Sequence, residues 1–144
     1  MLVLAALLVV APAAAGRPAA TAEQKPLPAW RECVAVQVTS PGQPSPDGVF
    51  SASRVYDLQL RALVMRRMVA GPHLLELRLY TPNGHLYQAL SVPFSDGWPA
   101  VNATLPVAGT AIMTSSLYGR WRVEPHLDGS SVPCGRSRSF VIQQ

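Results

Sequence analysis

Three histidines, His73, His85 and His126, are the residues of this sequence best suited to bind a metal or to move a proton near neutral pH. They are separated by at least 12 residues, and each stands beside a turn-forming segment. Zinc sites take three or four Cys, His or carboxylate ligands, usually at compact spacing. Because isolated histidines beside turns usually face solvent, the sequence predicts no metal site and no cofactor.

Serine and carboxylate patterns give no stronger indication of catalysis. The sequence contains no G-x-S-x-G segment, no P-loop and no dinucleotide-binding glycine pattern. Asp47, Asp96 and Asp128 each precede a glycine, and Asp-Gly turns account for them. We therefore expect no catalytic residues. A small secreted hydrolase remains the second alternative, because a Ser-His-Asp triad is recognised by its geometry and not by its sequence order.

The first residues predict export. Residues 1–15, MLVLAALLVVAPAAA, hold an apolar run from Leu2 to Ala11 followed by small residues, which is typical of a cleavable signal peptide. The run is shorter than the about 20 apolar residues that cross a bilayer. We expect cleavage after Ala15, with Ala20 as the other candidate position. The mature protein is then periplasmic or extracellular and has no membrane span.

The sequence contains two cysteines, Cys33 and Cys134, which could form a disulfide or a reactive thiol pair. A reactive thiol pair is expected at C-x-x-C spacing or beside basic residues that lower the thiol pKa. Cys33 and Cys134 have 100 residues between them, with no such motif in this stretch. An even number of cysteines in an exported chain predicts one structural disulfide.

The charge pattern argues against a nucleic-acid partner. The formal net charge is +4, and the basic residues are scattered singly apart from Arg66-Arg67. A nucleic-acid-binding surface needs basic residues gathered on one face. We expect the partner to be another envelope or extracellular protein, with a glycan as the alternative ligand.

The elements that must position these residues begin after residue 29. Residues 16–29 hold three prolines and no alternation, which predicts a flexible tether before a single domain over residues 30–144. In WRECVAVQVTS, three valines at alternate positions predict a strand: Val34, Val36 and Val38. Residues 40–48, SPGQPSPDG, predict an exposed loop.

Residues 53–70 permit two interpretations. Ser53 as N-cap and Gly71 as a stop favour a helix. Alternating apolar residues favour a strand instead, with one face formed by Leu58, Leu60, Ala62 and Val64. We favour the strand, because a lone helix is less consistent with the strand patterns on both sides of it.

The next two segments predict a hairpin. HLLELRLY places Leu75, Leu77 and Leu79 on one face, and HLYQALSVPF forms the returning strand after Asn83-Gly84. Leu79 and Leu86 are expected in the core. The exposed aromatic and imidazole side chains form the candidate binding patch: Tyr80, His85, Tyr87 and Trp98.

The rest of the chain predicts further strands. VNATLPV and TAIMTSS are expected as edge strands or one bent strand, with Pro106 suited to an edge. In the C-terminal part, Trp121 and Val123 face inward, Asp128-Gly129 forms a turn, and SRSFVI ends the domain. About seven short strands separated by Gly, Pro, Asn and Asp turns predict an antiparallel β-sandwich.

The segments LYGRWRVEPHLDG, SFVI and LRLYTPNGHLYQ resemble strands of bacterial immunoglobulin-like, fibronectin-III-like and macroglobulin-like domains. The resemblance covers roughly residues 73–142 and implies an immunoglobulin-like sandwich that serves as an accessory or interaction module. It implies no catalytic residues. We therefore expect an exported, non-catalytic module for structural or protein-protein interactions. A carbohydrate- or small-ligand-binding domain is the first alternative, and it predicts Trp98 beside a tyrosine on one face.

Overall fold

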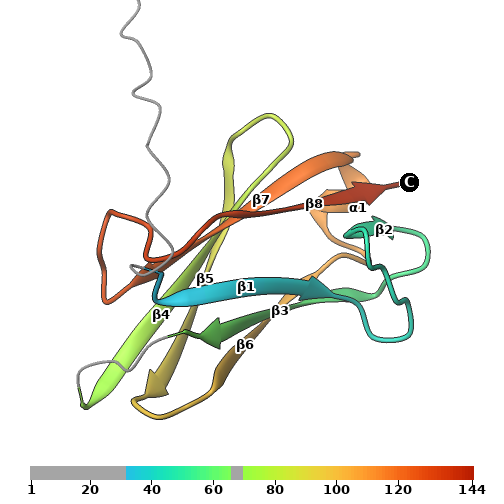
Figure 1. The fold of residues 1–144 in the computed structure, drawn as a ribbon. Helices are drawn as coiled ribbons and strands as arrows, with labels where there is room; N and C mark the ends of the chain where they lie inside the picture. The colour runs from blue at the N-terminus through green and yellow to red at the C-terminus, as the bar shows by residue number, and fades with distance from the viewer. Residues whose placement is uncertain (1–31, 66–69) are drawn as a thin grey trace, which may run out of the picture.

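The computed structural model describes residues 32–65 and 70–144. They form two facing β-sheets, one with the order β1-β3-β6 and one with the order β2-β8-β7-β4-β5 (Figure 1). The elements are β1 (Val34–Thr39), β2 (Val49–Ser51), β3 (Asp57–Val64), β4 (Pro72–Tyr80), β5 (Leu86–Ser95), β6 (Ala100–Pro106), α1 (Ala111–Thr114), β7 (Gly119–Leu127) and β8 (Arg138–Gln143). The predicted sandwich is confirmed, with eight strands in place of about seven. The predicted signal peptide (1–15) and tether (16–29) lie outside the described residues.

The core lies between the two sheets and is built from alternate residues of each strand. Successive side chains of a strand point to opposite faces of its sheet. The three valines of β1 are therefore buried together with the three alternate leucines of β4, namely Leu75, Leu77 and Leu79. Burying one such side chain fully contributes about 1.5–3 kcal/mol to folding.

Residues 57–64 form a strand, so the strand interpretation of this segment is confirmed. Leu58, Leu60 and Ala62 are fully buried on the inner face of β3. β3 pairs with β1 on one side and with β6 on the other, antiparallel in both cases. Because β3 lies between two other strands, its side chains alternate between the core face and the outer face, and the apolar residues at alternate positions match this alternation. Residues 66–69 lie outside the described part of the chain.

The predicted hairpin joins β4 to β5, and its turn uses Asn83-Gly84. The backbone N–H of Thr81 donates to the carbonyl of His85 (2.9 Å), and Gly84 has a φ of +82° that glycine adopts without steric cost. The pairing then shifts, because Leu79 lies opposite Gln88 and Tyr80 lies opposite Leu86. Tyr87 is thus the extra residue of a β-bulge.

This bulge changes which side chains of the hairpin are buried. Tyr87 turns inward and packs edge-on against Trp121, with the ring centroids 5.2 Å apart. Leu86 is exposed, so the expectation that it belongs to the core is wrong. The simple alternation assumed for β5 fails here because one inserted residue reverses the faces of the strand.

Residues 110–116 do not form the expected strand. Thr110 instead caps the one-turn helix α1, and its hydroxyl oxygen accepts from the backbone N–H of Ile112 (3.3 Å). Ile112 is fully buried and anchors this turn to the core. A threonine N-cap and one buried isoleucine therefore fix a helical turn where β-branched residues suggested a strand.

β2 was not predicted, because it lies directly after the Pro-Gly-rich loop and is only three residues long. It pairs in parallel with β8, so Phe50 lies beside Ile142. Both side chains are buried. The chain thus crosses from the first sheet to the second between β1 and β2 (Figure 1).

Trp121 occupies the centre of the core, as the sequence predicts. Its side chain is fully buried, and Nε1 donates to the carbonyl of Leu117 (2.9 Å). The ring of Phe140 on β8 stacks beside it at a centroid distance of 6.3 Å. Among residues 32–65 and 70–144, no helix has the length and apolar character needed to span a bilayer.

Candidate functional site

Several connections of the sandwich gather at one end because neighbouring strands are mostly antiparallel. We call this the disulfide end, made of residues 32–33, 65, 70–74, 96–99 and 128–137. It contains the start of β1 and the β5–β6 and β7–β8 connections, and lies at the left in Figure 1. The β1–β2, β4–β5 and β6–β7 connections lie at the opposite end.

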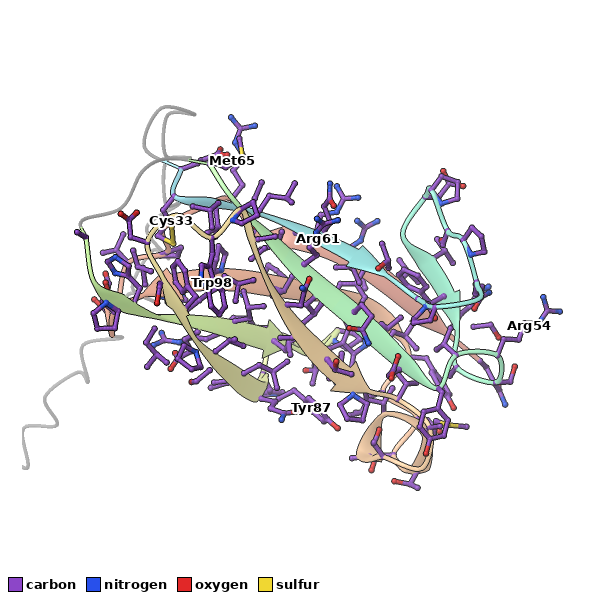
Figure 2. The ribbon with its side chains drawn as sticks, turned by 90° about the horizontal axis from the view of Figure 1, so that it is seen from below. Cys33, Arg54, Arg61, Met65, Tyr87 and Trp98 are labelled. Carbon is purple, nitrogen blue, oxygen red and sulfur yellow. A yellow bond between two sulfur atoms is a disulfide. The ribbon has the colours of Figure 1, made fainter. Side chains whose placement is uncertain are left out.

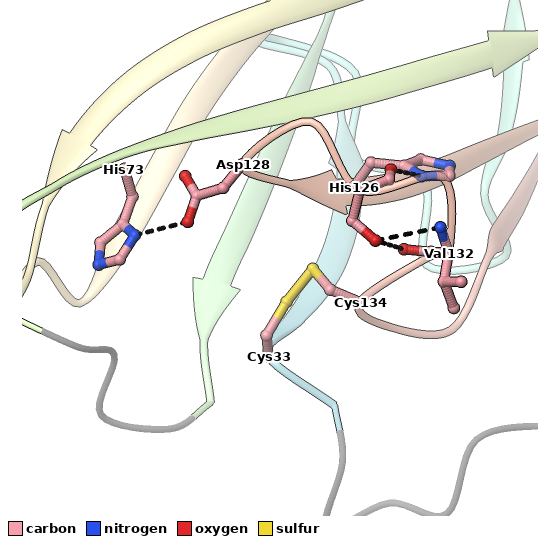
Figure 3. Close-up of a disulfide and its surroundings, with 7 residues drawn as sticks. Cys33, His73, His126, Asp128, Val132 and Cys134 are labelled. Carbon is pink, nitrogen blue, oxygen red and sulfur yellow. Dashed lines mark hydrogen bonds and ion pairs between the residues drawn. A yellow bond between two sulfur atoms is a disulfide. The ribbon is translucent and has the colours of Figure 1, made fainter.

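A disulfide between Cys33 and Cys134 ties this end together (Figure 3). The backbone N–H of Cys33 donates to the carbonyl of Cys134 (2.6 Å), and that of Met65 donates to the carbonyl of Cys33 (2.9 Å). The bridge and these bonds hold the start of β1, the end of β3 and the β7–β8 connection in one place. The two sheets are therefore joined covalently at this end.

Gly135, the residue after the bridge, allows the two segments to approach closely. A Cβ atom at this position would overlap the carbonyl oxygen of Val34 and also contact Pro125. The overlapping atom belongs to the backbone of β1, which a side-chain rotation cannot move. Any larger residue here would push the β7–β8 connection away from β1.

Asp128 fixes the β7–β8 turn to β4 (Figure 3). Its Oδ1 accepts from the backbone N–H of Leu74 (2.8 Å), and its Oδ2 accepts from Nδ1 of His73 (2.9 Å). The bond from Leu74, followed by the one from His73, lowers the pKa of the Asp128 carboxyl below its ordinary value of 3.8. Because both oxygens hold the turn in place, the His73–Asp128 pair has a structural explanation.

The His73 side chain is only 9% exposed, so the expectation of solvent-facing histidines is wrong for His73 and also for His126, which is more completely buried at 2% exposure. The β7–β8 connection folds back over the ring, and Nδ1 donates to the carbonyl of Ser130 (3.0 Å). Nε2 has no hydrogen-bond partner and lies 3.6 Å from Oε2 of Glu124. Among the described residues, no group of three His, Cys, Asp or Glu side chains is arranged to hold a metal ion.

Exposed apolar side chains concentrate at the disulfide end. Of the six large apolar residues with exposed side chains among residues 32–65 and 70–144, four lie there: Met65 (57%), Leu74 (42%), Trp98 (50%) and Val132 (58%). We call these four residues the apolar set. The other two, Tyr56 and Leu86, lie singly at the opposite end.

Met65 and Trp98 are neighbours across the first sheet. Leu63 pairs with Ala100, and the backbone N–H of Val64 donates to the carbonyl of Pro99 (3.0 Å). Continuing this register by one residue places Met65 opposite Trp98. Figure 2 shows both at the end that carries Cys33, far from Arg54. The remaining members, Leu74 and Val132, belong to the second sheet's side of the same end.

The outer face of the five-stranded sheet differs from this end because it carries charged side chains, two pairs of which contact each other. Arg78 forms an ion pair with Glu76, and Arg122 forms one with Glu124. The guanidinium carbon of Arg122 also lies 4.2 Å from the centre of the Tyr80 ring, in a cation-π contact. Arg120 on the same face is exposed as well, so this face is a solvated polar surface.

The four residues of the predicted binding patch are not all brought together. Tyr80 lies under Arg122, His85 is exposed at the hairpin turn, and Tyr87 packs against the core. Trp98 follows the far end of β5, a strand of 10 residues that spans about 33 Å. Trp98 is therefore separated from the other three and belongs to the apolar set.

The net charge of the protein lies outside the described residues. Residues 32–65 and 70–144 contain seven arginines and seven acids, which cancel. The remaining residues, 1–31 and 66–69, contain five basic residues and one acid and so carry the whole net charge of +4. Both segments join the described chain at the disulfide end, at Glu32 and between Met65 and Ala70.

The strand order identifies the type of sandwich. β4, β7 and β8 are neighbours in one sheet with β5 at its edge, as strands C, F, G and C′ are in immunoglobulin domains. The fold is an immunoglobulin-like β-sandwich. It departs from antibody domains in its disulfide, which joins β1 to the β7–β8 connection and not the two central strands, and in the position of its buried Trp121 on β7.

Comparisons with known proteins add structural likenesses only. No family model and no curated protein sequence matches the chain. An immunoglobulin-like protein from Pseudomonas aeruginosa is similar in structure at 14% identity and a TM-score of 0.42, covering 76% of this chain and 91% of that one. A β-glucosidase from Kluyveromyces marxianus is similar at 11% identity and a TM-score of 0.30, and the match spans 76% of this chain but only 15% of the glucosidase.

Proposed function

We propose that this protein is an exported, non-catalytic interaction module of the cell envelope or extracellular space, and that it binds its partner with the disulfide end. The observation that carries the proposal is that, within the part of the chain that the structure describes, four of the six exposed large apolar side chains lie at that end. Apolar surface gathered in one region of a folded domain marks a site of contact with another molecule. The disulfide and the Asp128 hydrogen bonds hold the segments that present it.

Export is supported by two features. The Cys33–Cys134 bond is of the kind that persists in oxidising compartments outside the cytosol. The apolar run from Leu2 to Ala11 followed by small residues has the pattern of a signal peptide. Together they favour a periplasmic or secreted protein.

The alternatives receive less support from the same residues. A glycan site built on Trp98 would need a neighbouring tyrosine to extend the stacking platform. The four tyrosines of the chain all lie toward the opposite end, at positions 56, 80, 87 and 118. A hydrolase would use the His73–Asp128 pair, whose hydrogen bonds are explained by the turn that they hold.

A photo-crosslinking experiment tests the proposal. The photoreactive residue p-benzoylphenylalanine is placed at position 98 or, as the control, at position 56, because Tyr56 is more exposed than Trp98 but lies at the opposite end. We expect strong crosslinks in the envelope fraction or culture medium from position 98 and weak ones from position 56. Equal crosslinking from both positions, or none from position 98, would show that the disulfide end is not the binding surface.

A further inference from the structure

We infer that the protein forms a two-fold symmetric dimer in which the β5 strands of two copies pair along their open edges. The two five-stranded sheets then become one continuous sheet across the two-fold axis. Dimerisation by this edge is independent of the partner that the disulfide end binds. Because the paired strands run antiparallel, the disulfide ends of the two copies would point in opposite directions, as in a bridge between two partners.

β5 is a long edge strand without charged side chains. Among the described residues, β4 is the only strand that pairs with it, so its other edge is open. Exposed edges are normally protected from further pairing by charges, bulges, prolines or short length. β5 has ten residues, its bulge lies at Tyr87 and its proline at position 93, so residues 88–92 lack these protections. The described edge strands β1, β2 and β6 are shorter, at six, three and seven residues.

Backbone groups of alternate β5 residues point away from β4. The N–H of Asp96 donates to the carbonyl of Gly71 (3.2 Å), so continuing the register directs the backbone groups of residues 88, 90, 92 and 94 toward β4. Ala89, Ser91 and Pro93 therefore direct theirs to the open edge. Pro93 agrees with this direction, because a proline in a sheet occurs where its missing N–H would face away from the ladder. Ala89 and Ser91 thus present two donors and two acceptors for pairing.

A second copy of β5 satisfies these groups when the Leu90 residues of the two copies lie opposite each other. Ala89 then lies opposite Ser91 of the second copy. Each such pair exchanges two hydrogen bonds, which gives four across the two-fold axis. Leu90 shares the inner face of the sheet with its partner Leu77 and is only half buried in a single copy. Contact between the two Leu90 side chains therefore removes apolar surface from water.

The charges of β4 favour a second copy as the occupant of this edge. On the outer face, Arg78 lies beside Ala89 and Glu76 lies beside Ser91. In the pairing centred on Leu90, one row of outer side chains runs through Arg78 and Ala89 and then through Ser91 and Glu76 of the second copy. The two-fold axis repeats this row in the reverse direction. Arg78 of each copy and Glu76 of the other are then three strand spacings apart, about 14 Å, and both side chains can extend over the small residues between them.

Sedimentation velocity of the disulfide-bonded protein at micromolar to millimolar concentration tests the inference. We expect an equilibrium between monomer and dimer, because pairing uses the open β5 edge of each copy. Ser91→Pro removes one outward N–H from each copy and with it two of the four hydrogen bonds. It should raise the dissociation constant at least about tenfold. The bonds to β4 remain, since the N–H of Ser91 points away from β4 as the nitrogen of Pro93 does.

Two matched variants test the position of the interface. Ala89→Asp and Asn102→Asp each place a carboxylate at an exposed outer position that pairs with an arginine, Arg78 and Arg61 respectively. Only position 89 lies on the β5 edge, where the new carboxylate enters the row that contains Glu76 of the second copy. We expect Ala89→Asp to raise the dissociation constant at least about tenfold and Asn102→Asp to leave it unchanged, with circular dichroism confirming that both variants fold.

The outcomes either support or overturn the β5 dimer. A protein that stays monomeric at millimolar concentration overturns it. A dimer that Ala89→Asp does not weaken, or that Asn102→Asp weakens equally, forms through another surface and also overturns it. If Ser91→Pro does not fold, Ala89→Asp and its control decide alone. Crosslinking from position 98 tests the proposed function separately, because position 98 lies outside the β5 edge.

Discussion

Removing the Cys33–Cys134 bridge should destabilise the protein without unfolding it. The bridge closes a loop of 101 residues. For a loop of this length, the chain-entropy relation gives a stabilisation of about 4.7 kcal/mol, and measured values are commonly about 2–4 kcal/mol. The backbone bonds between Cys33 and Cys134 and between Met65 and Cys33 do not involve sulfur, so the double variant Cys33→Ser/Cys134→Ser retains them. Most of the loss then arises in the unfolded chain, which becomes freer.

Urea unfolding followed by circular dichroism measures this loss. With a denaturant dependence of about 1.5 kcal/mol per molar urea, a loss of about 3 kcal/mol lowers the midpoint by about 2 M. The unchanged protein in reducing agent is the matched control and should unfold at nearly the same midpoint as the double variant. If the double variant and the bridged protein unfold at the same midpoint, while mass spectrometry shows the bridge intact in the latter, the reasoning is refuted.

Three further predictions concern single residues. Gly135→Ala should cost about 1–3 kcal/mol of unfolding free energy through overlap with the backbone of Val34, and unchanged urea stability would contradict the close approach. Tyr87→Ala should lower the free energy of unfolding by about 1–3 kcal/mol, because Trp121 loses its edge-on partner. Tyr87→Phe keeps the ring and should retain most of the stability. Equal losses in the two variants would show that the hydroxyl, and not the ring contact, is responsible. Asp128→Asn should cost less than about 1 kcal/mol at pH 7, because the Asp128 side chain is about half exposed and solvent screens its contacts. In the folded protein the pKa of the Asp128 carboxyl lies below its ordinary value of 3.8. The stabilisation by Asp128 is therefore present above about pH 4 and disappears as the pH falls through the folded pKa. A difference in urea stability between Asp128→Asn and the unchanged protein that persists at about pH 2 would contradict this prediction.

The strands that the sequence predicts well are those whose own side chains determine which face is buried. The leucines of β4 and Trp121 of β7 alternate with charged residues, and burial follows that alternation. The hairpin turn at Asn83-Gly84 is also local, because it depends on residues that accept a positive φ. These features need no information from distant parts of the chain.

The features that the sequence does not predict depend on contacts between distant segments. The bulge at Tyr87 is explained by the position of Trp121, which is 34 residues away in the chain. Likewise, His126 is buried because the β7–β8 connection folds over it. No local pattern distinguishes this histidine from an exposed one.

The candidate site was predicted only in part. Trp98 stands out in the sequence as an aromatic residue in a turn, but its neighbour Met65 follows from the long-range pairing of β3 with β6. Leu74 fits the alternating apolar pattern poorly, since Leu75, Leu77 and Leu79 face the core, and this mismatch was the available signal that it is exposed.

The position of the disulfide also determines how the protein would carry a pulling force. Tension applied between residues 32 and 144 passes from Cys33 through the sulfur atoms to Cys134 and then along β8. The residues between the two cysteines form a closed ring outside this load path. The covalent path from Cys134 to residue 144 measures at most about 36 Å when extended, at about 3.6 Å per residue. Most of this path already runs along the extended strand β8 in Figure 1. The protein would therefore act as a nearly inextensible link, even with its sheets unfolded, until the sulfur–sulfur bond is reduced.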